Sequence, residues 1–229
     1  NRIFNYGAFL LNTGKEEDCL RWAAFASPKY PDSERWREFT RAAVNNRIQK
    51  LAKAGQFAAA RELLERQKTA AGPENYALLD SMLTGTELFD RASKIRNSGE
   101  GDSVLDLIEI AHNSGLIDDN RADELVVLAV QRTAAILSAA RPVPDSGVPG
   151  RDWPGAVNYI QKAAGRFGTS RSLERILRDY QTNYAIDFHN RFAAAWNKKN
   201  YDEARRVIAE GLALFPGNKQ LLADKKLLE

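Results

Sequence analysis

The residue types that do most enzymatic and metal chemistry are few in this chain and far apart. His112 and His189 are the two histidines, and neither has a carboxylate or cysteine at the spacing of a metal-binding helix or a nucleophile–base pair. Cys19 stands alone, so no intramolecular disulfide or cysteine-based metal site is possible. Asp118 and Asp119 fit a helix start, where negative charge stabilises exposed amides. We therefore expect no enzyme activity, no cofactor and no bound metal.

Composition argues against two classes of partner. Lys and Arg number 33 against 30 Asp and Glu, and no run of consecutive basic residues occurs, so nucleic-acid binding is not expected. The most apolar stretch, residues 125–137, is interrupted by Gln131 and Arg132. It falls short of the roughly 18 to 20 apolar residues that a membrane span needs. We expect a soluble protein, and the sequence leaves open whether it is cytoplasmic or periplasmic.

One set of polar side chains recurs at helical spacing. Arg41, Asn45, Gln49 and Lys53 are four residues apart throughout, which places them along one helical ridge. Amide and cationic donors suit a peptide backbone or a carboxylate. The same spacing also describes the solvated side of an ordinary helix, and both interpretations stay open. With this donor ridge we group further candidate partner-binding residues: Asn12, Ser93, Arg96, Asn97, His189, Trp196 and Asn197.

A recurring sequence pattern predicts the helices that carry these residues. An aromatic residue stands three positions before an alanine at Phe57, Trp153 and Tyr201, each time after a break and before an amphipathic stretch. Looser versions surround Cys19 and Val104. The units recur at roughly 40 to 50 residues, near the period of helical-hairpin arrays. One hairpin cannot bury both of its apolar stripes, so neighbouring hairpins must stack.

The last unit shows the pattern most completely. Asn200 is a good N-cap, and Glu203 can complete a reciprocal cap. An apolar stripe at i, i+3, i+4 spacing follows, and the residues from Pro216 to Asn218 then end the helix. Residues 218–229 are too few for another hairpin. They are predicted to form a short cap over the open end of the stack.

At both ends the chain resembles a tetratricopeptide-repeat protein. The segment Asn200–Asn218 is similar to the second helix and exit turn of such a repeat. So is the stretch with Gly14, Cys19, Ala23, Ala26 and Pro31, preceded by Tyr6-Gly7 and Leu10, and so are Gly55, Phe57, Ala60 and Leu64. The resemblance implies that the first helices line a concave groove, with the second helices on the convex back. These first helices are expected near 1–12, 33–54, 73–98, 119–141 and 171–198, the last three longer than the family's usual first helix.

The predicted fold is all-α: a TPR-like α-solenoid of about five antiparallel helix pairs with a short C-terminal capping helix. We expect one domain, 1–229, with hairpins at about 1–31, 32–71, 72–117, 118–169 and 170–217 and the cap at 218–229. The irregular segment 142–152 interrupts the fourth hairpin. It is either a contact loop presented by the scaffold or a tolerated insertion at a hairpin tip.

The expected function is a non-catalytic scaffold that binds a peptide or protein segment in its concave groove. An alternative is a homo-oligomerising or hydrophobic-ligand-binding accessory subunit of a larger transport or envelope assembly, so a homodimer and a small hydrophobic ligand stay open. The chain begins at Asn1, inside a helical pattern and without a methionine. That beginning suggests the processed or shortened remainder of a longer chain.

Overall fold

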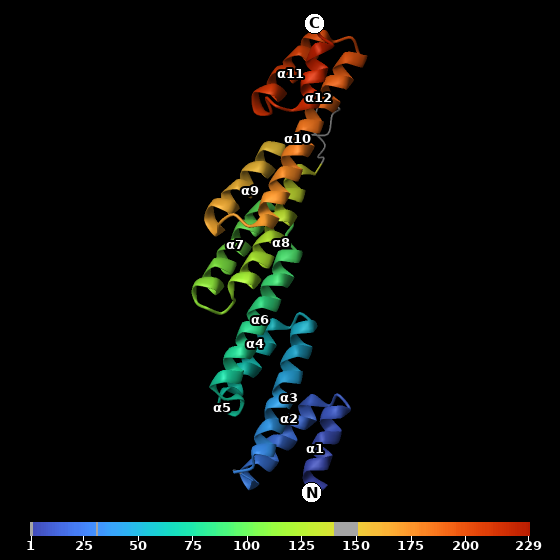
Figure 1. Ribbon diagram of the computed structural model, residues 1–229. Helices are drawn as coiled ribbons and strands as arrows, with labels where there is room; N and C mark the ends of the chain where they lie inside the picture. The colour runs from blue at the N-terminus through green and yellow to red at the C-terminus, as the bar shows by residue number, and fades with distance from the viewer. Residues whose placement is uncertain (1, 31, 140–150) are drawn as a thin grey trace. The chain divides into compact units, whose positions relative to one another are not determined.

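The computed structural model describes residues 2–30, 32–139 and 151–229, whose regular elements are all helical (Figure 1). The expected all-α class is thus confirmed for this part of the chain. The residues form two compact units, unit 1 with Asn1–Ile95 and Gly99–Ala129, and unit 2 with Arg96–Ser98 and Val130–Glu229. The single continuous solenoid stays a prediction, because each unit is defined by its own internal packing.

Unit 1 begins with two helix pairs. Helix α1 (Arg2–Asn12) packs on α2 (Glu16–Ala26), which is followed by a 3-10 turn, η1 (Ser27–Lys29). Helix α3 (Glu34–Lys53) then packs on α2 and on its own partner α4 (Phe57–Arg66). The first helix α3 thus lies against the second helix before it and the second helix after it. This is the local packing that a helical-hairpin array requires.

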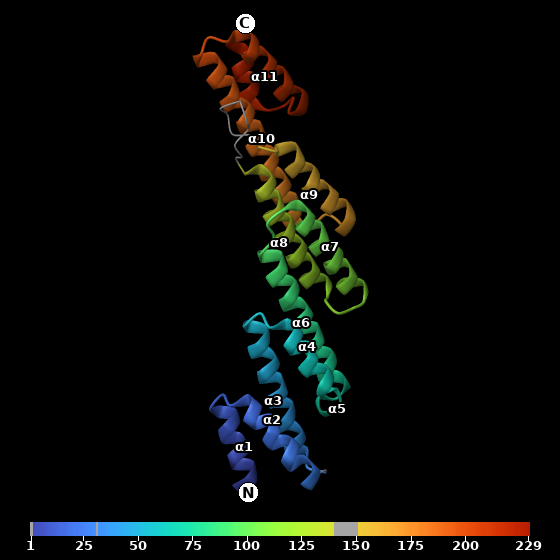
Figure 2. The ribbon, with the colours of Figure 1, turned by 180° about the vertical axis from the view of Figure 1, so that it is seen from behind.

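The rest of unit 1 continues from α4. A one-turn helix, α5 (Lys68–Ala71), leads into α6 (Pro73–Ser93), which packs against both α3 and α4 (Figure 2). Helices α7 (Ser98–Asn113) and α8 (Asp119–Ser138) follow, and α8 contributes residues to both units. A hydrogen bond of 3.2 Å from Arg121 Nη2 to the Gly85 carbonyl oxygen ties the start of α8 to α6.

Two apolar clusters hold α1, α2, α3, α4 and α6 together. The first fills the space between α1, α2 and α3, and the second the space between α3, α4 and α6. Their buried members come from i, i+3, i+4 stripes, so α3 contributes one stripe to each cluster. The first cluster contains Leu10, Cys19, Ala23, Ala26, Trp36, Phe39 and Ala43, and the second Val44, Ile48, Leu51, Ala52, Ala60, Leu63, Leu64, Leu79 and Leu83.

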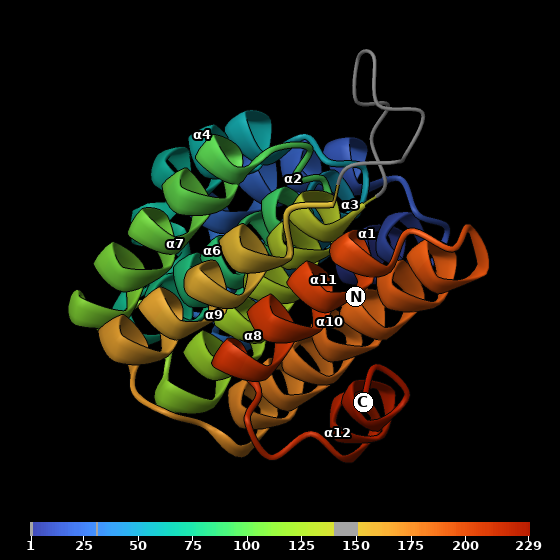
Figure 3. The same ribbon diagram turned by 90° about the horizontal axis from the view of Figure 1, so that it is seen from above.

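Unit 2 is organised around its longest helix. Helix α10 (Arg171–Asn197) contacts α9 (Trp153–Phe167) and α11 (Tyr201–Leu214), and the short α12 (Lys219–Lys226) packs on α10 and α11 (Figure 3). Leu221 of α12 is fully buried in their shared core. Asp224, also buried, lies 2.7 Å from the His189 ring on α10. A short terminal helix therefore covers this pair, as the sequence predicts.

The caps and boundaries differ from expectation in two places. Asn200 Oδ1 accepts from the Glu203 backbone N–H at 3.2 Å, as predicted, but the expected reciprocal cap is wrong: the Glu203 carboxylate instead binds Arg206 at 2.7 Å. Helix α6 ends at Ser93 rather than near 98, and α7 begins at Ser98 with Gly101 buried inside it. Most of the 142–152 segment lies outside the described residues. Asp152, at its end, caps α9 by accepting from the Gly155 N–H at 2.8 Å.

Candidate functional site

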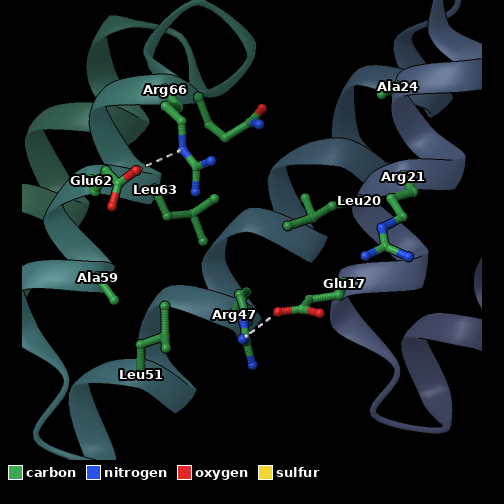
Figure 4. Close-up of a pocket in the computed structure, with 11 residues that line it drawn as sticks. Glu17, Leu20, Arg21, Ala24, Arg47, Leu51, Ala59, Glu62, Leu63 and Arg66 are labelled. Carbon is green, nitrogen blue, oxygen red and sulfur yellow. Dashed lines mark hydrogen bonds and ion pairs between the residues drawn. The ribbon is translucent and has the colours of Figure 1, made fainter.

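A groove of about 510 Å³ lies between the two second helices α2 and α4, above the first helix α3 (Figure 4). Its apolar lining includes Leu20 from α2, Leu51 from α3 and Leu63 from α4. Ala24 and Ala59, exposed on α2 and α4, contribute small side chains to the walls. The groove therefore has an apolar floor supported by the core and walls low enough to leave room for a guest side chain.

Charged residues form the rims of this groove. Both second helices carry a glutamate and, four residues later, an arginine: Glu17 and Arg21 on α2, and Glu62 and Arg66 on α4. This spacing places each pair on one face of its helix. From α3, Arg47 Nη2 reaches Glu17 Oε1 at 2.7 Å. The groove thus combines an apolar floor with charges of both signs on its rims.

A second groove occupies the equivalent place one pair further along unit 1. It encloses about 320 Å³ between α4 and α7, above α6. Its charges are tied to one another, since Arg61 of α4 lies 3.1 Å from Asp80 and 2.9 Å from Glu87, both on α6. Leu107 and Ile110 of α7 expose apolar surface beside it. The arrangement of a first helix beneath two second helices is thus repeated within unit 1.

Glu87 is the carboxylate whose ionisation this second groove most clearly alters. Burial by itself would raise the pKa of Glu87. Hydrogen bonds and charges from Arg91 and Arg61 outweigh that effect and hold the pKa below its ordinary value. Glu87 is therefore held ionised by its two arginine partners and serves as a structural anion between α4 and α6.

The predicted donor ridge on α3 does not line the α2–α4 groove. At about 100° per residue, Arg41, Asn45, Gln49 and Lys53 lie on the side of α3 away from Arg47 and Leu51, which do line it. The placement differs because the expected groove belonged to the first helices. The groove described above instead lies between second helices.

Two residues of the donor ridge, Asn45 and Arg41, already have side-chain partners within unit 1. Asn45 and Asn75 of α6 exchange two side-chain hydrogen bonds of 3.3 and 3.1 Å. Arg41 Nη1 lies 3.8 Å from Glu34. Gln49 and Lys53 are exposed. The amide of Asn45 therefore joins two first helices, and a ligand-binding role for the ridge stays a prediction.

The other candidates are divided between the two units. In unit 1, Asn12 is exposed at the end of α1, and the Ser93 hydroxyl donates to the Asp90 carbonyl oxygen at 2.8 Å. Unit 2 contains the remainder, namely Arg96 and Asn97 before α7, and His189, Trp196 and Asn197 on α10. Of these, His189 binds Asp224. The ring of Trp196 packs on that of Tyr201, with the ring centroids 5.2 Å apart. The predicted residues are thus distributed over both units, and a shared site for them stays a prediction.

Sequence reasoning missed the lining of the α2–α4 groove because it assigned the second helices to a convex back. A signal was nevertheless present. The spacing of Glu17 to Arg21 recurs from Glu62 to Arg66 on the next second helix, displaced by four residues relative to the anchors Cys19 and Ala60. Paired charges repeated on successive second helices indicate a shared surface. The resemblance to a repeat family directed attention to the other set of helices.

Neither a candidate metal centre nor a membrane-spanning helix is present in the part of the chain that the structure describes. Among the described residues, no cluster of three or more His, Cys, Asp or Glu side chains is arranged to hold a metal ion. Within the same residues, no helix has the combined length and apolarity required to cross a lipid bilayer. No protein-family model, curated protein or solved structure matches the chain.

Proposed function

We propose that this protein is a non-catalytic interaction scaffold whose α2–α4 groove binds a peptide or protein segment. The observation that carries the proposal is the open, leucine-floored space of about 510 Å³ between two second helices. Its volume falls within the range of about 300 to 1,000 Å³ typical of ligand sites. A groove between helices is also a common way of receiving an amphipathic segment.

The walls favour a polypeptide over a purely hydrophobic small molecule. Five of the lining residues, Glu17, Arg21, Arg47, Glu62 and Arg66, are charged. A purely hydrophobic ligand would make no favourable contact with these groups. A peptide offers both apolar side chains for the floor and polar groups for the rims. Because α2, α3 and α4 share buried clusters, the groove is expected to be formed before binding.

Blocking the groove tests the proposal. Peptides selected from a random displayed library on the native protein are measured by fluorescence anisotropy against Ala59→Trp, which places an indole in the groove. The matched control is Ala58→Trp, since Ala58 is also exposed on α4 but does not line the groove. We expect at least tenfold weaker binding to Ala59→Trp and unchanged binding to Ala58→Trp. Equal binding to both variants would reject this groove.

A second candidate function is self-association through the outer face of α1 and α2. We name this the aromatic face; it consists of Tyr6, Phe9, Trp22 and Phe25. Its rings are in contact, with centroids 6.4 Å apart for Tyr6 and Phe9, 5.0 Å for Tyr6 and Trp22, and 5.4 Å for Trp22 and Phe25. Tyr6, Phe9 and Phe25 are each about half exposed. Contiguous exposed aromatic surface is typical of an interface.

The charges near the aromatic face suit a second copy of the chain. Arg2 begins α1 and Lys29 follows α2, so these cations lie at one end of the antiparallel pair, with Lys29 Nζ 3.7 Å from the centre of the Phe25 ring. Asp18 lies in the first turn of α2, at the other end. Two copies joined by a two-fold axis across the helices would bring opposite charges together.

Sedimentation velocity tests self-association. Phe9→Asp is expected to shift the protein towards monomer at micromolar concentration, because it buries a carboxylate in the contact. Phe89→Asp is the control, since Phe89 is a comparably exposed aromatic residue on α6. A native protein that remains monomeric at hundreds of micromolar would dismiss this second function.

A further inference from the structure

The charged residues of the α2–α4 groove differ in how closely they are paired. Glu17 and Arg47 are joined by a 2.7 Å ion pair, and Figure 4 shows this pair on the side of the groove near Ala59 and Leu51. Arg21 and Arg66 lie one helical turn beyond Glu17 and Glu62. Figure 4 shows these two arginines on opposite walls, each with its guanidinium directed into the space between α2 and α4.

Arg21 and Arg66 are weakly engaged within the protein. Arg21 Nη1 is 3.9 Å from Asp18 Oδ1, and Arg66 Nε is 3.8 Å from Glu62 Oε1. Both distances exceed the usual range of about 2.7 to 3.2 Å for an N–H···O hydrogen bond. The two side chains are 80% and 65% exposed, respectively. Their guanidinium donors are thus available to an incoming acceptor, in contrast to those of Arg47.

The floor between these arginines is apolar. Leu20 of α2 and Leu63 of α4 approach the groove from either side, and Leu63 is almost fully buried. A guest that satisfied both surfaces needs an apolar side chain for the leucines and an anionic group for the arginines. Arginine binds carboxylates well because its planar donors match the two oxygen atoms.

On the basis of the proposed scaffold function, we propose that the groove selects segments in which an acidic side chain lies close to a large apolar one. The aspartate or glutamate carboxylate binds to Arg21 or to Arg66, and the apolar side chain packs on Leu20 and Leu63. Arg21 and Arg66 are the lining arginines without a close ion pair, and their charge commits the site to an anionic peptide. Binding is expected to weaken as salt concentration rises, because the arginines are solvent-exposed.

The test combines variants of the protein and of its ligand. Selected peptides are compared with versions in which each Glu or Asp is replaced by Gln or Asn. These are measured against native protein and against the double variant Arg21→Gln/Arg66→Gln. Arg37→Gln is the control, because Arg37 is an exposed, ion-paired arginine on α3 outside the groove. Thermal unfolding of each variant checks that the fold is retained.

We expect at least a tenfold loss of affinity for the double variant and no change for Arg37→Gln. The neutral peptides should bind the native protein and the double variant equally weakly, since the same carboxylate–arginine contact is missing in both. Full affinity of the double variant, together with loss in Ala59→Trp, would overturn the acidic specificity while leaving the groove intact. Full affinity in both would overturn the groove itself, and selected peptides lacking acidic residues would also refute this inference.

Discussion

The Arg61 guanidinium lies against the Glu87 carboxylate, with Nε and Nη2 at 3.1 and 2.9 Å from the same oxygen, Oε2. Its third nitrogen, Nη1, reaches Asp80 at 3.1 Å, and Nη2 also lies 3.2 Å from the Thr84 hydroxyl. One side chain of α4 thus binds three residues on a single face of α6. Arg61 is therefore a central polar contact between these two helices.

Removing this arginine is expected to destabilise unit 1. In Arg61→Met the apolar stem is kept, but the partly buried carboxylates of Asp80 and Glu87 lose their common partner. A loss of about 1 to 3 kcal/mol in the free energy of unfolding follows. Arg66→Met on the same helix breaks only an exposed pair and should change the free energy by less than about 0.5 kcal/mol. Urea denaturation of both variants measures the difference, and similar effects would contradict the role given to Arg61.

Acid should weaken the same contact. The pKa of Glu87 is lower in the folded protein than its ordinary value near 4.5. A lowered carboxyl pKa contributes stability that is present above the unfolded value and is lost as pH falls below it. We expect the urea concentration at the unfolding midpoint of the native protein to decrease as the pH is lowered from about 5 to about 3. The decrease should be smaller in Glu87→Gln, which has no carboxylate to protonate at this position. An identical pH dependence in the two proteins would show that Glu87 is not responsible.

Lys199, between α10 and α11, has a backbone conformation in which glycine should be more stable. Lys199 has a positive φ of 58°. In this turn the Lys199 N–H donates to the Trp196 carbonyl oxygen and the Asn200 N–H to the Ala195 carbonyl oxygen, each at 2.9 Å. The corresponding position after α3 is Gly55, with φ 71°. Glycine adopts this conformation without strain. Relief of about 1 to 2 kcal/mol of left-handed strain, less the entropy cost of glycine, should therefore let Lys199→Gly raise the free energy of unfolding by about 0.5 to 1 kcal/mol. Gly55→Lys should lower it. Thermal denaturation that finds Gly55→Lys more stable than Lys199→Gly would contradict this prediction.

The thiol of Cys19 should be unreactive in the folded protein. Cys19 is fully buried in the apolar cluster between α1, α2 and α3. This burial, with a smaller contribution from the Glu16 charge, raises the pKa of the Cys19 thiol to about 11. At about pH 8 its thiolate fraction is lower than that of a free cysteine by about two orders of magnitude. Iodoacetamide labelling followed by mass spectrometry should be slow in buffer and complete in urea. Rapid labelling of native protein would contradict the burial of this residue.

Much of the helical layout could be predicted because strong local signals mark it. Gly55 lies in the turn after α3, Asn200 caps α11, and the apolar stripes give the buried faces. The α6–α7 boundary was wrong because Gly101 suggests a break, yet it occupies a buried position within α7. A glycine in a sequence does not reveal whether it ends a helix or permits close packing inside one.

The candidate site was less predictable than the helices. Periodicity identified the ridge from Arg41 to Lys53, but it could not show that Asn45 is engaged by Asn75, thirty residues later. The α2–α4 groove depends on three helices packing together, so its lining is defined by tertiary contacts. Only the repeated Glu17–Arg21 and Glu62–Arg66 spacing was visible beforehand.

Site-specific photo-cross-linking tests most directly whether the α2–α4 groove holds a polypeptide segment. A benzophenone amino acid is placed at Ala24 or Ala59, on the two groove walls, and at the exposed control position Ala58. The protein is irradiated with a peptide selected on the native chain, and the adducts are mapped by mass spectrometry. Strong adducts from both wall positions and little from Ala58 are predicted. Adducts from Ala58 alone, or none from either wall while the peptide remains bound, would contradict the proposed site.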